Sequence, residues 1–137
     1  MAKVLIVDDE PSILQMLQMN LQIEGHVTYL ASDGETALKR IQAEEPDLVL
    51  LDIMMPVLDG WGVLQQLAEL NLKKRPRIIV MTAKAGGHDL MRGFRLGADE
   101  YITKPFEIDG FVEMVGITLA RSEEEVLKRR QEFMDES

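Results

Sequence analysis

The chain has 137 residues, of which 46% are hydrophobic and 28% charged, a composition that fits one folded soluble domain and excludes an intrinsically disordered chain. The sequence has no apolar run near the roughly 20 residues of a membrane span, no signal-peptide pattern and no cysteine, so we expect a cytoplasmic protein without disulfides or thiolate chemistry. A formal net charge of −9 argues against direct binding of nucleic acid.

Short apolar runs alternate with amphipathic segments along the chain, which predicts five successive β–α units. The strands are expected at residues 3–7, 27–30, 48–51, 78–81 and 101–103. The run at 48–51 is apolar at every position, which indicates a central strand buried on both faces, whereas the more polar run at 27–30 fits an edge. This pattern predicts an α/β fold with helices on both faces of a parallel sheet.

Polar side chains follow four of these apolar runs at the point where each run ends. Asp8 and Asp9 follow the first run and Asp52 follows the third, while Thr82 and Lys104 follow the fourth and fifth. The carboxyl ends of parallel strands share one edge of a sheet, where ligands bind. Carboxylates there repel one another by about 4 kcal/mol per pair at 4 Å and an effective dielectric near 20. The sequence therefore predicts a cation site at this edge.

Four strings in this order resemble the receiver domain of two-component response regulators. They are residues 7–10, 52–60, 81–83 and 97–106. The match covers about residues 3–121, so residues 1–121 are expected to form the receiver domain. The resemblance implies a doubly wound five-stranded parallel sheet of order 2-1-3-4-5, the flavodoxin-like (CheY-like) receiver fold, and a switch driven by phosphorylation of one aspartate.

The resemblance implies a role for each acidic residue. Asp52 corresponds to the phosphoacceptor. The metal ligands implied are Asp8, Asp9, Asp52 and the backbone carbonyl of Met54, with Mg²⁺ as the ion and Mn²⁺ as an alternative. Glu10 is assigned only to the start of the first helix.

The residues after the fourth and fifth strands correspond to the switch of the family. Lys104 is expected to contact the phosphoryl oxygens, and the bond to Pro105 is expected to be cis. Thr82 is expected to hydrogen-bond the phosphoryl group, and Tyr101 to rotate into the space that this movement vacates, with Ala83 leaving room. The implied readout is the face formed by the fourth helix, the fifth strand and the fifth helix.

Two positions near the path of hydrolytic water in receivers carry residues that bear on the lifetime of an acyl phosphate. They are Met54 and Lys84. A methionine cannot orient water and screens the phosphoryl group, so the sequence predicts a phosphorylated state that outlives that of receivers with an amide or acid there.

Two departures from the family pattern concern oligomerisation. In the subfamily that dimerises through the fourth and fifth helices, the fifth helix usually begins Glu-Leu-x-Ala-Arg, but here Gly110 and Met114 replace the acid and the base. We therefore expect a monomer or a weak dimer. The charged tail, residues 122–137, is expected to be a helical extension of the fifth helix or a linker.

The resemblance implies that the phosphodonor is a histidine kinase or a histidine phosphotransfer protein. The output would be a downstream protein target or an output domain that this sequence does not contain. Beyond phosphorylating itself and losing the phosphoryl group, the chain is not expected to be an enzyme. Two alternatives stay open: a pseudo-receiver that is never phosphorylated, and a magnesium-dependent phosphatase of the haloacid dehalogenase type with Asp8 as nucleophile.

Overall fold

The computed structural model describes the backbone of residues 2–83 and 87–135. Five parallel strands form one sheet in the order β2-β1-β3-β4-β5, which confirms the predicted fold class and strand order. The strands are β1 (Lys3–Val7), β2 (Val27–Ala31), β3 (Leu48–Asp52), β4 (Arg77–Thr82) and β5 (Glu100–Thr103). The helices are α1 (Pro11–Ile23), α2 (Gly34–Glu44), α3 (Gly60–Glu69), α4 (Gly87–Arg95), α5 (Ile108–Ala120) and α6 (Glu123–Asp135).

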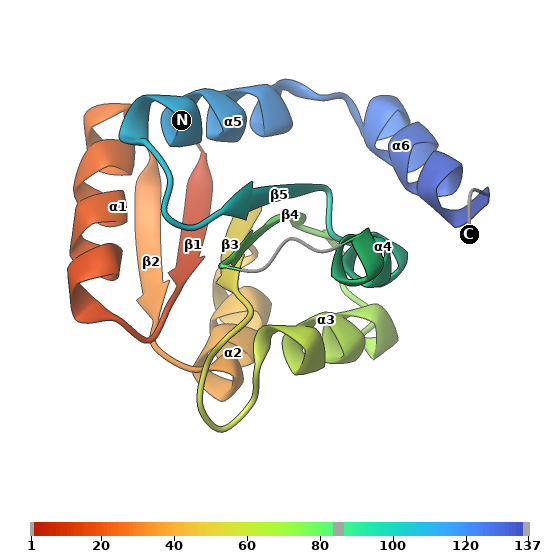
Figure 1. The fold of residues 1–137 in the computed structure, drawn as a ribbon, viewed down its shortest axis with the longest axis horizontal. Helices are drawn as coiled ribbons and strands as arrows, with labels where there is room; N and C mark the ends of the chain where they lie inside the picture. Colours follow the sequence, from red (N-terminus) through yellow and green to blue (C-terminus); the bar gives the residue numbers. More distant parts are fainter. Residues whose placement is uncertain (1, 84–86, 136–137) are drawn as a thin grey trace.

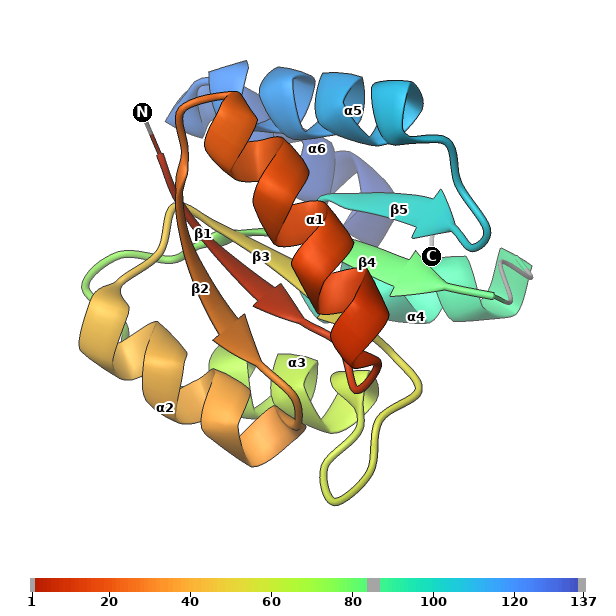
Figure 2. The same ribbon diagram turned by 90° about the vertical axis from the view of Figure 1, so that its left-hand side faces the viewer.

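Helices cover both faces of the sheet, as Figures 1 and 2 show, with α1 and α5 on one face and α2, α3 and α4 on the other. Alternate side chains of each strand therefore enter two separate cores. Every residue of β3 is buried, whereas β2 lies at the edge and is partly exposed, as the sequence predicted. This arrangement puts the carboxyl ends of β1, β3, β4 and β5 along one edge.

Local sequence signals set where several helices begin and end. Asp33 and Asp59 are the N-caps of α2 and α3, and their carboxylates accept hydrogen bonds from the Thr36 and Gly62 backbone N–H groups at 2.8 and 2.9 Å. Gly97 follows α4 with a φ of +108°, the left-handed conformation that a glycine adopts readily at the end of a helix. Within the described residues, no helix is both long and apolar enough to cross a membrane.

The charged tail is helical, but it does not continue α5. Arg121 is extended, with a ψ of 137°, and α6 begins two residues later. Ser122 and Glu125 form a capping box, in which each side chain accepts a hydrogen bond of 3.1 Å from the backbone N–H of the other. This box starts a new helix, which packs against α4 beyond the edge of the sheet (Figure 1).

Phe111→Ala is expected to lower the free energy of unfolding by about 3–5 kcal/mol, because it removes a buried ring from the core between α5 and the sheet. Phe111 is 1% exposed and stacks on Phe106 with ring centroids 5.3 Å apart. Urea denaturation followed by circular dichroism measures the loss. Ile117→Ala on the same helix is the control, since Ile117 is 51% exposed and should cost under about 1 kcal/mol. Equal losses for the two variants would contradict this account of the core.

Candidate functional site

An ammonium group lies between two buried carboxylates at the carboxyl edge of the sheet. Asp8 directly follows β1 and Asp52 is the last residue of β3, and they are 0% and 4% exposed. Lys104, which follows β5, donates from Nζ to Asp8 Oδ2 at 2.6 Å and lies 3.6 Å from Asp52 Oδ2. The structure thus joins three residues that are up to 96 positions apart in the sequence, at the edge where sequence analysis placed them.

The environment of Asp52 shifts the pKa of its carboxyl group toward neutral pH. Burial, followed by the negative charge of Asp8, raises the pKa of Asp52 to about 6, while Lys104 and the Met54 backbone N–H oppose the rise. That N–H donates to Oδ1 of Asp52 at 3.2 Å and leaves Oδ2 directed at Lys104. Burial lowers the pKa of Lys104, but the hydrogen bond to Asp8 and the charge of Asp52 outweigh it, so the net shift is upward. The lysine therefore stays charged.

Acidic oxygens gather beside this pair at the start of α1. Carboxylate oxygens of Asp8, Asp9 and Glu10 lie within 4.8 Å of one another, and Asp9 and Glu10 are exposed. Such a set of oxygen donors fits Mg²⁺ or Mn²⁺, which bind few protein carboxylates and keep several waters. Glu10 is not among the metal ligands that the sequence predicts, because an acid at a helix start has a simpler explanation.

The remaining predicted site residues lie around the same edge. Thr82 is 6% exposed at the end of β4, and Ala83 beside it is exposed. Met54 is 71% exposed, and the peptide bond between Lys104 and Pro105 is cis. Lys84 lies outside the described residues.

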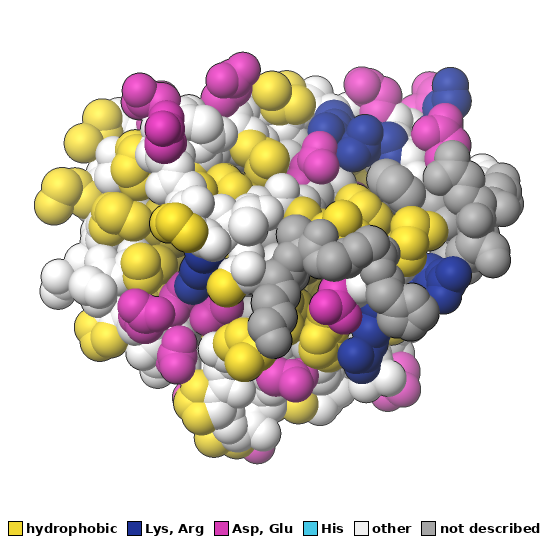
Figure 3. Space-filling model, in the orientation of Figure 1, with side chains coloured by type: hydrophobic (Ala, Val, Ile, Leu, Met, Phe, Trp, Pro, Cys, Tyr) yellow, Lys and Arg dark blue, Asp and Glu magenta, His cyan; other side chains and the backbone are white. Residues whose placement is uncertain are grey.

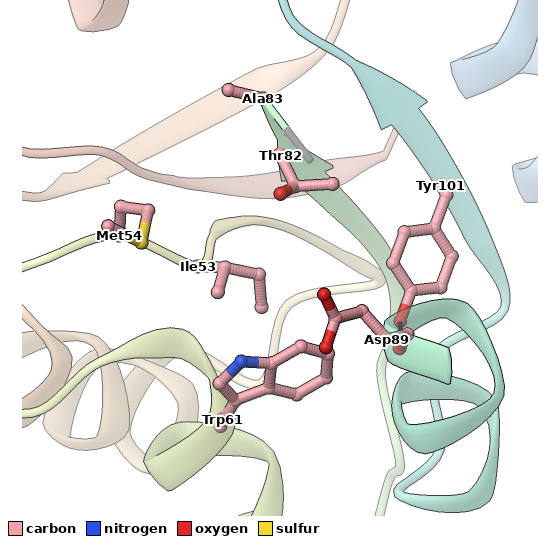
Figure 4. Close-up of a pocket in the computed structure, with 7 residues that line it drawn as sticks. All are labelled: Ile53, Met54, Trp61, Thr82, Ala83, Asp89 and Tyr101. Atoms are coloured by element: carbon pink, nitrogen blue, oxygen red, sulfur yellow. Dashed lines mark hydrogen bonds between the residues drawn. The ribbon is translucent and has the colours of Figure 1, made fainter. Parts of the chain in front are cut away.

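A cavity of about 160 Å³ opens next to Thr82, between the carboxyl edge and helices α3 and α4. Its lining residues, drawn in Figure 4, are Ile53, Met54, Trp61, Thr82, Ala83, Asp89 and Tyr101. Apolar side chains supply most of the wall, and the Asp89 carboxylate points into it between Thr82 and Trp61 (Figure 4). This cavity could not be predicted from the sequence, because its walls come from α3, β4, α4, β5 and the segments after β3 and β4, which only the fold brings together.

Tyr101 reaches from β5 into the wall of this cavity and contacts α4. Its hydroxyl donates a hydrogen bond of 2.8 Å to the Asp89 carbonyl, and its ring packs edge-on against Phe94 with centroids 5.2 Å apart. The hydroxyl fits only because position 93 is glycine, since a Cβ on Gly93 would overlap the hydroxyl oxygen. Burial, followed by the charge of Asp89, raises the pKa of Tyr101 to about 12.

A cation–π contact joins the two helices that flank the cavity. The Arg92 guanidinium carbon of α4 lies 4.7 Å from the ring centroid of Trp61 in α3. No spacing in the sequence pairs these residues. A glycine inside the predicted fourth helix, at position 93, was the available signal that something packs closely there.

The sequence and the fold of this chain match those of known proteins. A family model described as the response regulator receiver domain matches residues 4–116. The chain belongs to this family. As a receiver it is 46% identical over 121 residues to the alkaline phosphatase synthesis transcriptional regulatory protein PhoP of Bacillus subtilis, a match that covers 88% of this chain and 50% of that protein. The chain thus spans about half the length of this curated relative.

Two solved structures share the receiver fold. One is the chemotaxis protein CheY4 of Vibrio cholerae, with a TM-score of 0.81, 30% identity and coverage of 86% of this chain and 98% of that chain. The other is the receiver domain of the Francisella response regulator 1452, with a TM-score of 0.80, 34% identity and coverage of 87% and 97%. The resemblance inferred from the four sequence strings is therefore confirmed at the level of the family and the fold.

Gly93→Ala is expected to expel the Tyr101 hydroxyl from its contact with α4 and to lower the pKa of Tyr101 from about 12 toward the ordinary value near 10. Absorbance titration at 295 nm in a Tyr29→Phe background measures this pKa. Because the folded pKa is raised, Tyr101 adds stability that is full below about pH 10 and is lost as the pH rises toward 12. The stability of the variant should therefore fall less over this range.

Gly116→Ala is the matched control, since Gly116 lies inside α5 with open space where a Cβ would be. It should leave the Tyr101 titration unchanged and stabilise the protein by up to about 1 kcal/mol through helix propensity. An unchanged pKa of Tyr101 in Gly93→Ala would contradict the assigned close contact.

Proposed function

We propose that this receiver is a phosphorylation switch in which Asp52 accepts a phosphoryl group from a histidine kinase or a histidine phosphotransfer protein. The observation that carries the proposal is the Lys104 ammonium group, which lies 2.6 Å from Asp8 and 3.6 Å from Asp52 at the carboxyl edge. Both oxygens of Asp8 are engaged, by Lys104 and by the Glu10 backbone N–H at 3.0 Å. Oδ2 of Asp52 faces the Lys104 ammonium group, which is the positive charge that an incoming phosphoryl group would meet.

The proposed reaction is attack by Oδ2 of Asp52 on phosphorus. An O–P bond forms as the bond from phosphorus to the histidine nitrogen, or to the oxygen of a small acyl phosphate, breaks. The leaving group keeps the electron pair, and Asp52 becomes an acyl phosphate. With a pKa of about 6, Asp52 is mostly ionised at pH 7 and needs no general base. Lys104 contacts the carboxylate before the transfer and the phosphoryl oxygens after it, because the negative charge then lies on those oxygens.

Asp8, Asp9 and Asp52, with the Met54 carbonyl, are the residues that would hold Mg²⁺, and a carboxylate oxygen of Glu10 lies within 4.8 Å of those of Asp8 and Asp9. When bound, the ion supplies positive charge to the phosphoryl oxygens. The three carboxylates explain the need for it, since one ammonium group cannot balance them together with a phosphoryl group.

The proposed response involves Thr82 and Tyr101. Thr82 moves inward to hydrogen-bond the new phosphoryl group. This movement of Thr82 favours the inward position of Tyr101, in which its hydroxyl contacts α4. The signal passes to a downstream protein or to an output domain, as the similarity to a transcriptional regulatory protein of twice the length supports. The receiver itself is proposed to be a monomer or a weak dimer.

Incubation with acetyl phosphate and Mg²⁺ is expected to add one phosphoryl group to the intact protein, seen by mass spectrometry. Asp52→Asn removes the nucleophile, so its label should vanish, and a chelator should abolish labelling of the wild type. Lys39→Ala, far from the site on α2, is the control that should label normally. Label that persists in Asp52→Asn but disappears in Asp8→Asn would favour the phosphatase alternative. No label under any condition would favour a pseudo-receiver.

Met54→Asn is expected to shorten the lifetime of the acyl phosphate several-fold. Met54 is 71% exposed at the rim of the site, where its side chain screens Asp52 without orienting water, whereas an amide can hydrogen-bond a hydrolytic water. Loss of the phosphoprotein mass after removal of the donor measures the rate. Val57→Asn, at an 80% exposed position in the same loop, is the control. Equal rates for Met54→Asn and the wild type would refute the screening effect.

A further inference from the structure

Charged side chains of α6, in the part of the helix that the structure describes, anchor it to the receiver. Figure 3 shows acidic and basic side chains side by side over the end of α5 and over α6. Among the described side chains of α6, the buried apolar one is Val126, which is 5% exposed, while Leu127 is 64% exposed. Among residues 123–132 of α6, whose side chains the structure describes, charged contacts therefore outnumber buried apolar ones.

Asp99 is the centre of the contact. It lies just before β5, is 5% exposed, and accepts hydrogen bonds from two nitrogens of Arg130 at 3.0 and 2.9 Å. The same carboxylate accepts a hydrogen bond of 2.8 Å from the Ile78 backbone N–H of β4. A fork of two parallel bonds to a buried carboxylate is the strongest geometry available to arginine, and here it joins α6 to the sheet.

Glu100 provides a second acceptor beside the first. Its Oε2 lies 2.5 Å from Arg121 Nη2, at the end of α5, and 3.2 Å from Arg129 Nη2, in α6. Arg129 Nη2 also donates to the Asp99 carbonyl at 3.4 Å. We call Asp99, Glu100 and the adjoining side of α4 the acidic notch. The helix that fills the notch presents Val126 and, three and four positions later, Arg129 and Arg130 on one face.

We propose that the acidic notch is a helix-binding surface, which this chain fills with its own α6, and that α6 is an exchangeable occupant. The partner that fits is an amphipathic helix with the same pattern, an apolar residue followed three and four positions later by arginines. Binding of such a helix requires α6 to leave. Release needs no rearrangement of the sheet, because α6 is joined to α5 only through the extended Arg121 and Ser122.

The notch lies on elements that also contact the candidate phosphorylation site. Glu100 precedes Tyr101 in β5, and α4 both packs against α6 and accepts the Tyr101 hydrogen bond. Occupancy of the notch and the position of Tyr101 therefore act on the same two elements. The exchange itself needs no phosphorylation, so the tests below stand whether or not Asp52 is the phosphoacceptor.

Native-state hydrogen exchange of the wild-type chain is the first test. The amides of α6 are expected to exchange at least about ten-fold faster than the buried amides of α5, through an opening that low concentrations of urea barely accelerate. Raising the salt concentration should speed the exchange in α6 more than in α5, because ion pairs hold α6. Exchange of α6 only together with global unfolding would overturn the proposal, since a helix that never leaves alone cannot be exchanged.

Binding of a helix in trans is the second test. The probe is a fluorescent peptide of residues 121–135, measured by anisotropy against the full chain. The variant Arg129→Ala/Arg130→Ala, whose own α6 is released, should bind the peptide at least ten-fold more tightly than the wild type. Lys128→Ala, at an exposed position of α6 between the contact residues, is the matched control and should bind as weakly as the wild type.

A peptide with both arginines replaced by alanine should not bind the double variant. Equal binding of the native peptide by the wild type and the double variant, or no binding by either, would overturn the proposal. If the double variant does not fold, Glu100→Gln in the full chain serves instead, because it weakens the Arg129 contact while Asp99 keeps Arg130. It should speed the exchange of α6, and unchanged exchange would count against the notch.

Discussion

The Lys104 ammonium group holds the carboxyl edge of this receiver together, because it lies between two buried carboxylates that would otherwise repel each other. Asp8 and Asp52 can both end buried strands only if a positive charge remains near them. The balance is incomplete, since the pKa of Asp52 is still raised to about 6. Burial of the carboxyl group is the larger cause of this rise, and the negative charge of Asp8 is the second.

Helix α4 connects the carboxyl edge to the rest of the molecule. On one side it receives the Tyr101 hydroxyl beside Gly93 and places Arg92 over Trp61, and on the other it packs against α6. Phe94 of α4 and Leu96 just after it also pack against the core, so apolar, polar and aromatic contacts together hold this helix.

Local signals allowed most of the fold to be predicted. The apolar run at 48–51 indicated the central strand, and the order of the sheet followed from the family resemblance. The tail was harder. Its charge pattern indicated a helix, but the Ser122–Glu125 capping box that separates α6 from α5 was not recognised. The Ser122–Glu125 pattern of this box is visible in the sequence, whereas the docking of α6 on Asp99 is not.

The sequence by itself determined which chemical groups meet at the carboxyl edge, because each of Asp8, Asp52 and Lys104 ends or follows a strand and parallel strands all end on the same side. Only the tertiary structure decided how the other contacts pair. Trp61 with Arg92, Tyr101 with Gly93, and Asp99 with Arg130 each join elements whose separation depends on how helices pack. Side-chain contacts between helices follow from packing angles and distances, which no spacing along the chain encodes.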